Sequence, residues 1–233
     1  MLTVRQLTAH YGASQALFDV NLQIEAGQVV TLLGRNGMGK TTTINSIMGL
    51  VPPSGGELAF AGQSLRGMAA FRIANLGLGL VPEGRQIFPN LSVRENLIAT
   101  ASNHLRQPQP WTLERVLTLF PELGTRMGSM GNLLSGGEQQ MLAIGRALMT
   151  NPKLLILDEA TEGLAPLVRQ RIWQALDAIR QTGLAILIVD KNLHDRLKLA
   201  DHHVVIQRGR TVWQGSSQDL MANDEVRGTY LGL

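Results

Sequence analysis

The chain of 233 residues contains no cysteine, which excludes disulfide bonds, thiolate catalysis and cysteine-ligated metal sites. It also lacks a long hydrophobic run. The longest, residues 184–189, is far shorter than the roughly 20 residues that a membrane-spanning helix needs. The chain does not open with a basic stretch followed by an apolar core, so no signal peptide is expected. Any role at a membrane is therefore expected to depend on a partner.

The chain carries little excess charge of either sign. It has 21 lysine and arginine residues against 18 aspartate and glutamate residues, a net charge of +3. Because the basic residues are scattered along the sequence, no nucleic-acid partner is expected. The hydrophobic fraction of 44% is typical of an ordinary folded protein with a sizeable core. The length suits one large domain, with or without a subdomain.

Two strand patterns are present. Apolar and polar side chains alternate from Phe18 to Glu25, with Phe18 on the apolar side, which predicts an antiparallel strand with one solvated face. Residues 2–4 and 58–60 are expected to join the same sheet. Three further runs are apolar almost throughout, as strands buried on both faces of a parallel sheet are. These runs are residues 29–33, 154–157 and 186–189.

Helical patterns lie between and after these strands. Ile172, Leu176 and Ile179 recur at helical spacing, with Arg171 expected on the solvent side. Between residues 85 and 150 the strand pattern vanishes, and residues 113–120 carry one apolar helical face. We therefore predict an α/β fold in which residues 1–84 and 151–233 form a parallel-sheet core with an antiparallel β region. Residues 85–150 are predicted to form an inserted helical subdomain.

Residues 34–41, GRNGMGKT, match the P-loop pattern G-x-x-x-x-G-K-[ST] between an apolar run and helix-compatible sequence. The glycines let backbone N–H groups turn toward phosphates, and the start of the helix adds partial positive charge. Lys40 can reach the β- and γ-phosphates, and the Thr41 hydroxyl can ligate Mg²⁺. The sequence thus predicts ATP and Mg²⁺ as ligands. The predicted binding residues of this segment are Gly34, Asn36, Gly37, Gly39, Lys40, Thr41 and Thr42.

A pair of carboxylates follows the apolar run at residues 154–157. The carboxyl end of a parallel strand lies at the ligand-binding edge of its sheet. Asp158 is predicted to hold Mg²⁺, and Glu159 to polarise the attacking water. Taken alone, a strand that ends in Asp-Glu is more often a capped turn. The upstream P-loop favours the catalytic interpretation.

A second glycine motif, LSGGEQQ at residues 134–140, opens a predicted helix. Ser135 and Glu138 can form a capping box, and the simpler interpretation is just a helix start. Alternatively, Ser135 and the amides of Gly136 and Gly137 face an anion. One nucleotide does not need two such helix starts from a single chain. The second interpretation therefore requires that the chain folds back or that a partner supplies one of them.

The order of GRNGMGKTT, LLSGGEQQ and LLILDEA along the chain resembles the ABC ATPase family. The resemblance covers nearly the whole sequence and implies a RecA-like P-loop NTPase fold. It also implies that two such domains pair head-to-tail, each lending residues 135–138 to the γ-phosphate bound by the other. The implied partners are a second ABC ATPase subunit, identical or different, and transmembrane permease subunits. The implied location is peripheral, at the cytoplasmic face of the inner membrane.

Three further roles follow from this resemblance. Tyr11 occupies the position of an aromatic residue that stacks on adenine, although a half-buried tyrosine at a strand edge is an alternative. Glu83 occupies the place of the usual glutamine that links the Mg²⁺ site to the membrane domain. Lys191 replaces the usual histidine that contacts the γ-phosphate, either as a point cation or pointing away. His194 is expected to be a surface residue.

The segments VPEGRQIFPNLSV (residues 81–93) and EGLAP (residues 162–166) are similar to those of the ATPases of branched-chain amino acid, urea or amide importers. Ala160 departs from that branch, which usually has proline. Two other functions stay open: an ABC-type ATPase that acts on nucleic acid or ribosomes, and a nucleotide switch that barely hydrolyses ATP. The first usually has tandem cassettes or a long coiled coil. Glu159 argues against the second, whereas Lys191 keeps it open.

Overall fold

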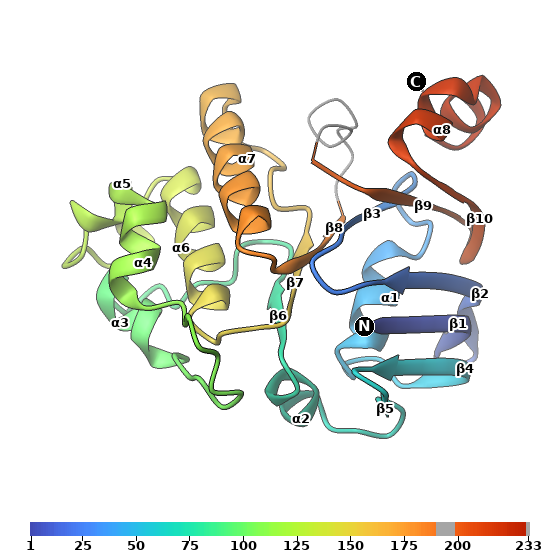
Figure 1. The fold of residues 1–233 in the computed structure, drawn as a ribbon, viewed down its shortest axis with the longest axis horizontal. Helices are drawn as coiled ribbons and strands as arrows, with labels where there is room; N and C mark the ends of the chain where they lie inside the picture. The colour runs from blue at the N-terminus through green and yellow to red at the C-terminus, as the bar shows by residue number, and fades with distance from the viewer. Residues whose placement is uncertain (190–198, 232–233) are drawn as a thin grey trace.

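The computed structural model describes residues 1–189 and 199–231, and its architecture is a mixed sheet with helices on both sides (Figure 1). The ten strands lie in the order β5-β4-β1-β2-β10-β9-β3-β8-β7-β6. Strands β3, β6, β7, β8 and β9 pair only in parallel with one another. Their bounds are Val29–Leu33, Leu78–Val81, Leu154–Asp158, Ala185–Val189 and His202–Gln207. The three predicted buried runs therefore form strands of one parallel sheet, and the prediction of an α/β fold is confirmed.

The antiparallel region is built from β1 (Leu2–Tyr11), β2 (Ser14–Ile24), β4 (Pro53–Phe60) and β5 (Gln63–Ser64). Strand β1 lies between β2 and β4 and pairs antiparallel with both. The prediction for this region is confirmed, because β2 and the two other expected segments share one sheet. Strand β10 (Arg210–Gly215) joins the two regions, since it pairs antiparallel with β9 and meets β2 at one parallel register position.

The prediction that Phe18 faces the core is wrong. Its side chain is 39% exposed, and the neighbouring Leu17 is fully buried instead. The register of β1 and β2 shifts between the pairs Leu7–Val20 and Ala9–Leu17. An irregularity of this kind exchanges the faces of the residues beyond it, so the strict alternation holds only from Val20 onward.

The helices follow the predicted patterns. Those of the segment between β6 and β7 gather at one side of the molecule, on the left in Figure 1. Val116 and Phe120 are fully buried there, as the helical face at residues 113–120 predicts. In residues 85–150, all of which the structure describes, the only β pairing is the isolated bridge between Ser92 and Met130. The division of the chain at residues 85 and 150 stays a prediction. These helices are α3 (Val93–Ala99), α4 (Leu113–Leu119), α5 (Pro121–Gly124), a 3-10 turn (Gly131–Leu133) and α6 (Gly136–Leu148).

The remaining helices pack against the sheet. α1 (Lys40–Ile47) begins directly after Gly39, and α7 (Pro166–Gln181) buries Ile172, Leu176 and Ile179 as predicted. No helix among the described residues is both long and apolar enough to cross a lipid bilayer. The others are α2 (Ala70–Asn75), α8 (Ser217–Ala222) and a final π-helical turn (Val226–Leu231).

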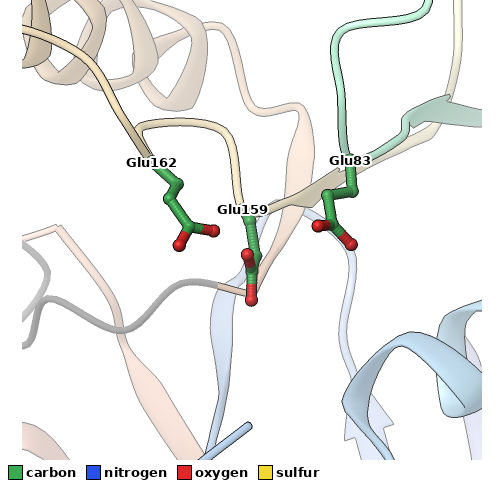
Figure 2. A group of neighbouring side chains, drawn as sticks. All are labelled: Glu83, Glu159 and Glu162. Atoms are coloured by element: carbon green, nitrogen blue, oxygen red, sulfur yellow. The ribbon is translucent and has the colours of Figure 1, made fainter.

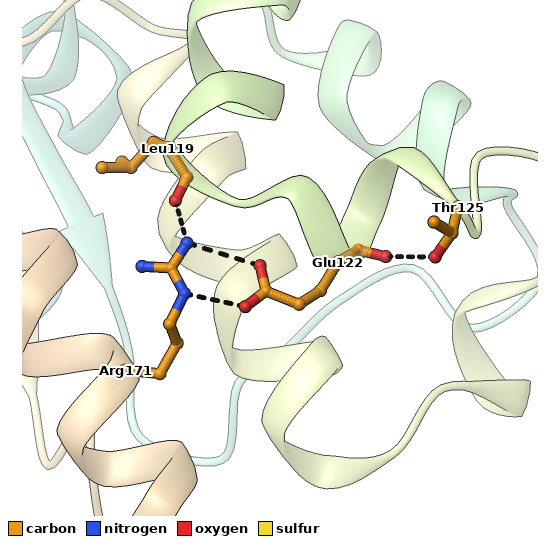
Figure 3. Close-up of polar contacts among 4 residues, drawn as sticks. All are labelled: Leu119, Glu122, Thr125 and Arg171. Atoms are coloured by element: carbon orange, nitrogen blue, oxygen red, sulfur yellow. Dashed lines mark hydrogen bonds and ion pairs between the residues drawn. The ribbon is translucent and has the colours of Figure 1, made fainter.

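Arg171 is only partly exposed, because it also joins α7 to the segment that contains α4 and α5 (Figure 3). Its Nε donates to Glu122 Oε1 at 2.7 Å, and its Nη2 donates to the backbone carbonyl of Leu119. Thr125 Oγ1 donates to the Glu122 carbonyl at 2.9 Å. Burial pushes the pKa of Glu122 upward, but the hydrogen bonds and positive charge of Arg171 outweigh burial and leave it lowered. Arg171 therefore fixes the position of α5 against α7.

We expect Arg171→Gln to lower the free energy of unfolding by about 1 kcal/mol at neutral pH, a modest value because both side chains are partly exposed. A carboxyl whose folded pKa is lowered adds stability above its unfolded pKa of about 4.3 and loses it as the pH falls through the folded pKa. The loss caused by the variant should therefore shrink at acid pH. Urea unfolding at neutral and at acid pH measures this loss of unfolding free energy. The control is Arg169→Gln, a change of the same kind on the same helix. If Arg171→Gln and Arg169→Gln lower the free energy of unfolding equally, the contact between Arg171 and Glu122 does not stabilise the fold.

Candidate functional site

A cavity of about 600 Å³ lies at the carboxyl ends of β3, β6 and β7. This is the edge of a parallel sheet where ligands bind. The cavity brings together three parts of the sequence that are far apart: the glycine-rich turn before α1, the residue after β6, and the turn after β7. Its lining includes Asn36, Gly37, Gly39, Lys40, Thr41, Thr42, Glu83, Glu159 and Glu162.

The glycine-rich turn needs its glycines. Gly34, Gly37 and Gly39 have φ values of 147°, 75° and 105°, which L-residues rarely adopt. A Cβ on Gly34 would lie 2.3 Å from the Ile206 carbonyl oxygen, and one on Gly39 would lie 2.8 Å from Leu17 Cδ2. The turn can therefore pass close to β9 and β2 only with glycine at these two positions.

The side chain of Lys40 lies inside this turn and binds its backbone. Its side chain is almost fully buried, and Nζ donates to the carbonyl oxygens of Gly34 at 2.8 Å and Arg35 at 3.0 Å. α1 begins here without a side-chain cap, since its N-cap residue is Gly39. The first amides of the helix are thus available to an anion, and the lysine charge lies beside them. The segment is arranged as a phosphate-binding turn.

Asp158 lies just behind Thr41 and is only 3% exposed. Burial raises the pKa of Asp158, and the charge of Glu83 adds to this; a hydrogen bond with Thr41 and the charge of Lys40 oppose it. Its Oδ1 atom is buried and has no hydrogen-bond partner among the described residues. A buried carboxylate oxygen without a partner costs stability unless a ligand satisfies it.

Three carboxylates, from Glu83, Glu159 and Glu162, cluster beside it (Figure 2). One oxygen from each lies within 4.8 Å of the others. Figure 2 shows the side chain of Glu159 between those of Glu83 and Glu162. Glu159 has a φ of 51° and donates its N–H to the Val189 carbonyl at 2.8 Å. The backbone bond therefore holds the residue after β7 in a sparsely populated conformation, with its carboxylate in the cavity.

These groups fit a Mg²⁺ ion. Mg²⁺ prefers carboxylate and hydroxyl oxygens together with phosphate oxygens. The buried Oδ1 of Asp158 and the carboxylate of Glu83 supply excess negative charge, and the Thr41 hydroxyl adjoins them. Thr41, Asp158 and Glu83 are thus the residues that would hold the ion. When bound, it supplies positive charge that neutralises the phosphates.

The second glycine motif lies elsewhere. Residues 135–138 are not part of the cavity lining. The capping box is present, with the Ser135 N–H donating to Glu138 Oε2 at 2.7 Å and the Glu138 N–H donating to Ser135 Oγ at 3.3 Å. Ser135 is exposed, Gly136 is partly exposed and Gly137 is buried. The structure therefore contains the helix start of the simpler interpretation, and the phosphate-facing role of Ser135, Gly136, Gly137 and Glu138 stays a prediction.

Of the predicted residues that remain, the structure describes Tyr11. Tyr11, at the end of β1, is 51% exposed and does not line the cavity. Its stacking role stays a prediction. Lys191 and His194 lie outside the described residues.

Sequence reasoning did not predict six of the residues that line the cavity, which are Gln15, Ala16, Phe18, Glu162, Arg208 and Gly209. Phe18 lines the cavity, with the Arg210 guanidinium 5.2 Å from its ring centroid. Arg208 lines it from the turn between β9 and β10. Glu162 reaches it because the chain turns back after Glu159, whose carbonyl accepts the Glu162 N–H at 3.2 Å. The sequence signal for Glu162 was present, since it lies three residues after the acidic pair.

A parallel sheet with a glycine-rich turn, a buried lysine and a strand-end aspartate defines a P-loop nucleoside triphosphatase. The family described as "ABC transporter" matches residues 17–162. The chain belongs to this family of transporter ATP-binding subunits, and it is an ATPase of the kind coupled to transport.

Three known proteins illustrate the similarity. The chain is 39% identical over 232 residues to the high-affinity branched-chain amino acid transport ATP-binding protein BraG of Pseudomonas aeruginosa, with 100% of both chains covered. It is 31% identical to the lipopolysaccharide export system ATP-binding protein LptB of Escherichia coli K12, covering 99% of this chain and 97% of that one. A dimeric structure of the ATP-binding cassette MJ0796 bound to ADP and Pi has a TM-score of 0.80 at 25% identity, over 93% of this chain and 99% of that one.

We expect Asp158→Asn to leave the nucleotide-free protein as stable as the wild type or more stable, because it removes a desolvated charge. A carboxyl whose folded pKa is raised costs stability as the pH rises through its unfolded pKa of about 3.9 toward the folded pKa. Because Asp158→Asn carries no charge at this position, it should not show this loss of stability at neutral pH. It should also lose most of the increase in melting temperature that Mg²⁺ with ATP gives the wild type.

The matched control is Asp177→Asn, an exposed aspartate on α7 that accepts a hydrogen bond from Gln181. This control should keep the full effect of Mg²⁺ with ATP. A nucleotide-free Asp158→Asn protein that melts far below the wild type would show that Asp158 is a structural residue rather than a ligand.

Proposed function

We propose that this chain is the ATP-hydrolysing subunit of an importer for branched-chain amino acids or a related small polar solute. The proposal rests on the cavity, because Lys40, Thr41 and Glu159 all line it. The full-length identity to BraG and the segments around Glu83 and Glu162 support the importer branch. The 31% identity to LptB favours an exporter as the second candidate.

In the proposed reaction, ATP enters the cavity with its phosphates against the turn at residues 34–41. Lys40 Nζ, now bonded to two backbone carbonyls, turns its charge toward the β- and γ-phosphates. Thr41, Asp158 and Glu83 would hold Mg²⁺, whose positive charge would neutralise the phosphates. Glu159 orients the attacking water toward the γ-phosphorus and accepts its proton as the new P–O bond forms. The bond between the γ-phosphorus and the β,γ-bridging oxygen breaks, and ADP leaves with that oxygen.

A second subunit completes the site in this proposal. Residues 135–138 lie outside this chain's own cavity, as expected if they serve another chain's nucleotide. Two subunits, identical or different, then close around ATP and open after hydrolysis. Permease subunits couple this cycle to transport, with the ATPase at the cytoplasmic face of the inner membrane. The position of Glu159 in the cavity favours hydrolysis over a nucleotide switch.

The test is Glu159→Gln. We expect it to retain ATP binding, to lower turnover by roughly 10²–10⁴-fold through loss of the base, and to elute as a dimer on gel filtration with ATP. Glu162→Gln, a change of the same kind in the same cluster, should lower turnover less than about tenfold, because Glu162 is not the proposed base.

Unchanged turnover in Glu159→Gln would remove this residue from the mechanism. If Glu162→Gln loses ATP turnover and Glu159→Gln does not, Glu162 is the general base. To separate the two solute classes, transport of radiolabelled leucine and of lipid can be compared in membranes that contain the whole transporter.

A further inference from the structure

The side chain of Arg85, in the turn after β6, lies on the first turn of α6. A Cβ added to Gly136 would be 2.8 Å from Arg85 Nη1 and 2.9 Å from Arg85 Nη2, so the guanidinium covers this glycine. Arg85 Nη1 also donates to Gln139 Oε1 at 3.2 Å, and Gln139 Nε2 donates to the Gly131 carbonyl at 3.1 Å. Arg85 therefore contacts the second glycine motif at two of its residues.

Arg85 brings a positive charge to this helix start. The acidic residue of the motif, Glu138, belongs to the capping box and lies 3.4 Å from Arg126 Nε. Burial pushes the pKa of Glu138 upward, but its hydrogen bonds with Ser135 and the charge of Arg126 outweigh burial and leave it lowered. Arg85 instead donates to a neutral amide oxygen, and it forms no salt bridge within the part of the chain that the structure describes. Its charge therefore adds to the partial positive charge of the first amides of α6.

The turn that carries Arg85 begins at the nucleotide cavity. Glu83 lies in the carboxylate cluster, two residues before Arg85. Arg85 and Gln86 have φ values of 65° and 43°, which residues other than glycine adopt only where contacts hold them. The contacts of the Arg85 side chain with α6 are of this kind. The turn therefore joins two parts of the molecule, the cavity through Glu83 and the second glycine motif through Arg85.

We infer that Arg85 is a positioning residue that acts on the nucleotide bound by the second subunit rather than on the nucleotide bound by its own chain. The inference rests on the proposed function, in which residues 135–138 meet the γ-phosphate of the other subunit's ATP. Arg85 holds Gly136 and Gln139 in the position that this contact needs, and its charge strengthens the attraction of the nearby amides for an anion. One turn thus serves two nucleotides, with Glu83 at the first and Arg85 at the second.

The first experiment compares the binding of ATP and ADP to the full chain that carries Glu159→Gln, so that ATP is not consumed. Adding Arg85→Gln should raise the dissociation constant for ATP by at least about tenfold, because the contact that Arg85 supports is made to the γ-phosphate. ADP lacks this phosphate, so its dissociation constant should stay within about twofold. Arg85→Lys should recover part of the ATP affinity, since it keeps the charge without the planar guanidinium.

The second experiment identifies the nucleotide on which Arg85 acts. Pairs of Glu159→Gln subunits, identical or different, are prepared with one competent P-loop each, and this chain carries Arg85→Gln. If this chain also carries Lys40→Ala, the other subunit holds the nucleotide, and the affinity for ATP should fall by at least about tenfold. If the P-loop lysine of the other subunit is replaced instead, this chain holds the nucleotide, and the affinity should stay within about twofold. Each pair is compared with the same pair in which Arg85 is intact.

The matched control is Arg94→Gln, which removes the same charge from an exposed position on α3. It should leave the affinities for ATP and ADP within about twofold of those of the protein with Arg94 intact. Thermal unfolding of each variant without nucleotide shows whether it is folded. If Arg85→Gln does not fold, Arg85→Lys takes its place in both experiments, with the same expected direction and a smaller effect.

Three results would overturn the inference. If the affinity for ATP falls only in the pair in which this chain holds the nucleotide, Arg85 acts on its own cavity through Glu83. If it falls equally in both pairs, or for ADP as much as for ATP, the change at Arg85 has a general effect on the fold. If it is unchanged in both pairs, Arg85 has no role in binding. Failure of the Glu159→Gln protein with intact Arg85 to form a dimer with ATP would instead overturn the proposed function.

Discussion

The parallel pairing of β3, β8, β7 and β6 is the constraint on which the rest of the structure depends. Parallel strands bring their carboxyl ends to one edge of a sheet. Here that edge receives the glycine-rich turn after β3, the residues after β6 and the acidic pair at the end of β7. Residues more than a hundred positions apart in sequence thus share one cavity without a long-range loop.

Acidic side chains are concentrated at this edge of the sheet. Three glutamate carboxylates lie within 4.8 Å of one another beside the buried Asp158, whose Oδ1 has no hydrogen-bond partner in the part of the chain that is described. A buried carboxylate oxygen of this kind lowers the stability of the nucleotide-free protein, and a cation that binds it would offset that loss. The turn after β6 lies in the same region, and its residues Gly84, Arg85 and Gln86 have φ values of 76°, 65° and 43°, which are unfavourable for residues other than glycine. The nucleotide-free protein is thus less stable at the site where a bound ligand would stabilise it.

Local sequence patterns predicted most of this site. Lys40 and Thr41 were found because a P-loop is a contiguous segment with a fixed spacing, and Asp158 because an apolar strand leads directly to it. Residues that reach the cavity through an irregular backbone conformation were not predicted from the sequence. Phe18 enters the cavity through a register shift that an alternating pattern does not reveal, and Glu162 through a turn that depends on the left-handed conformation of Glu159. The ion pair of Arg171 was not predicted, because its partner Glu122 comes from a distant helix.

The most direct test of this account is a crystal structure of the Glu159→Gln protein grown with Mg²⁺ and ATP. The account predicts the triphosphate along residues 34–41, with Lys40 Nζ on the phosphates and the Mg²⁺ ion held by Thr41 and Asp158. It also predicts that Ser135 of a second chain meets the γ-phosphate. A triphosphate bound away from this turn, or an ion held by Glu159 and Glu162 without Thr41 and Asp158, would contradict it.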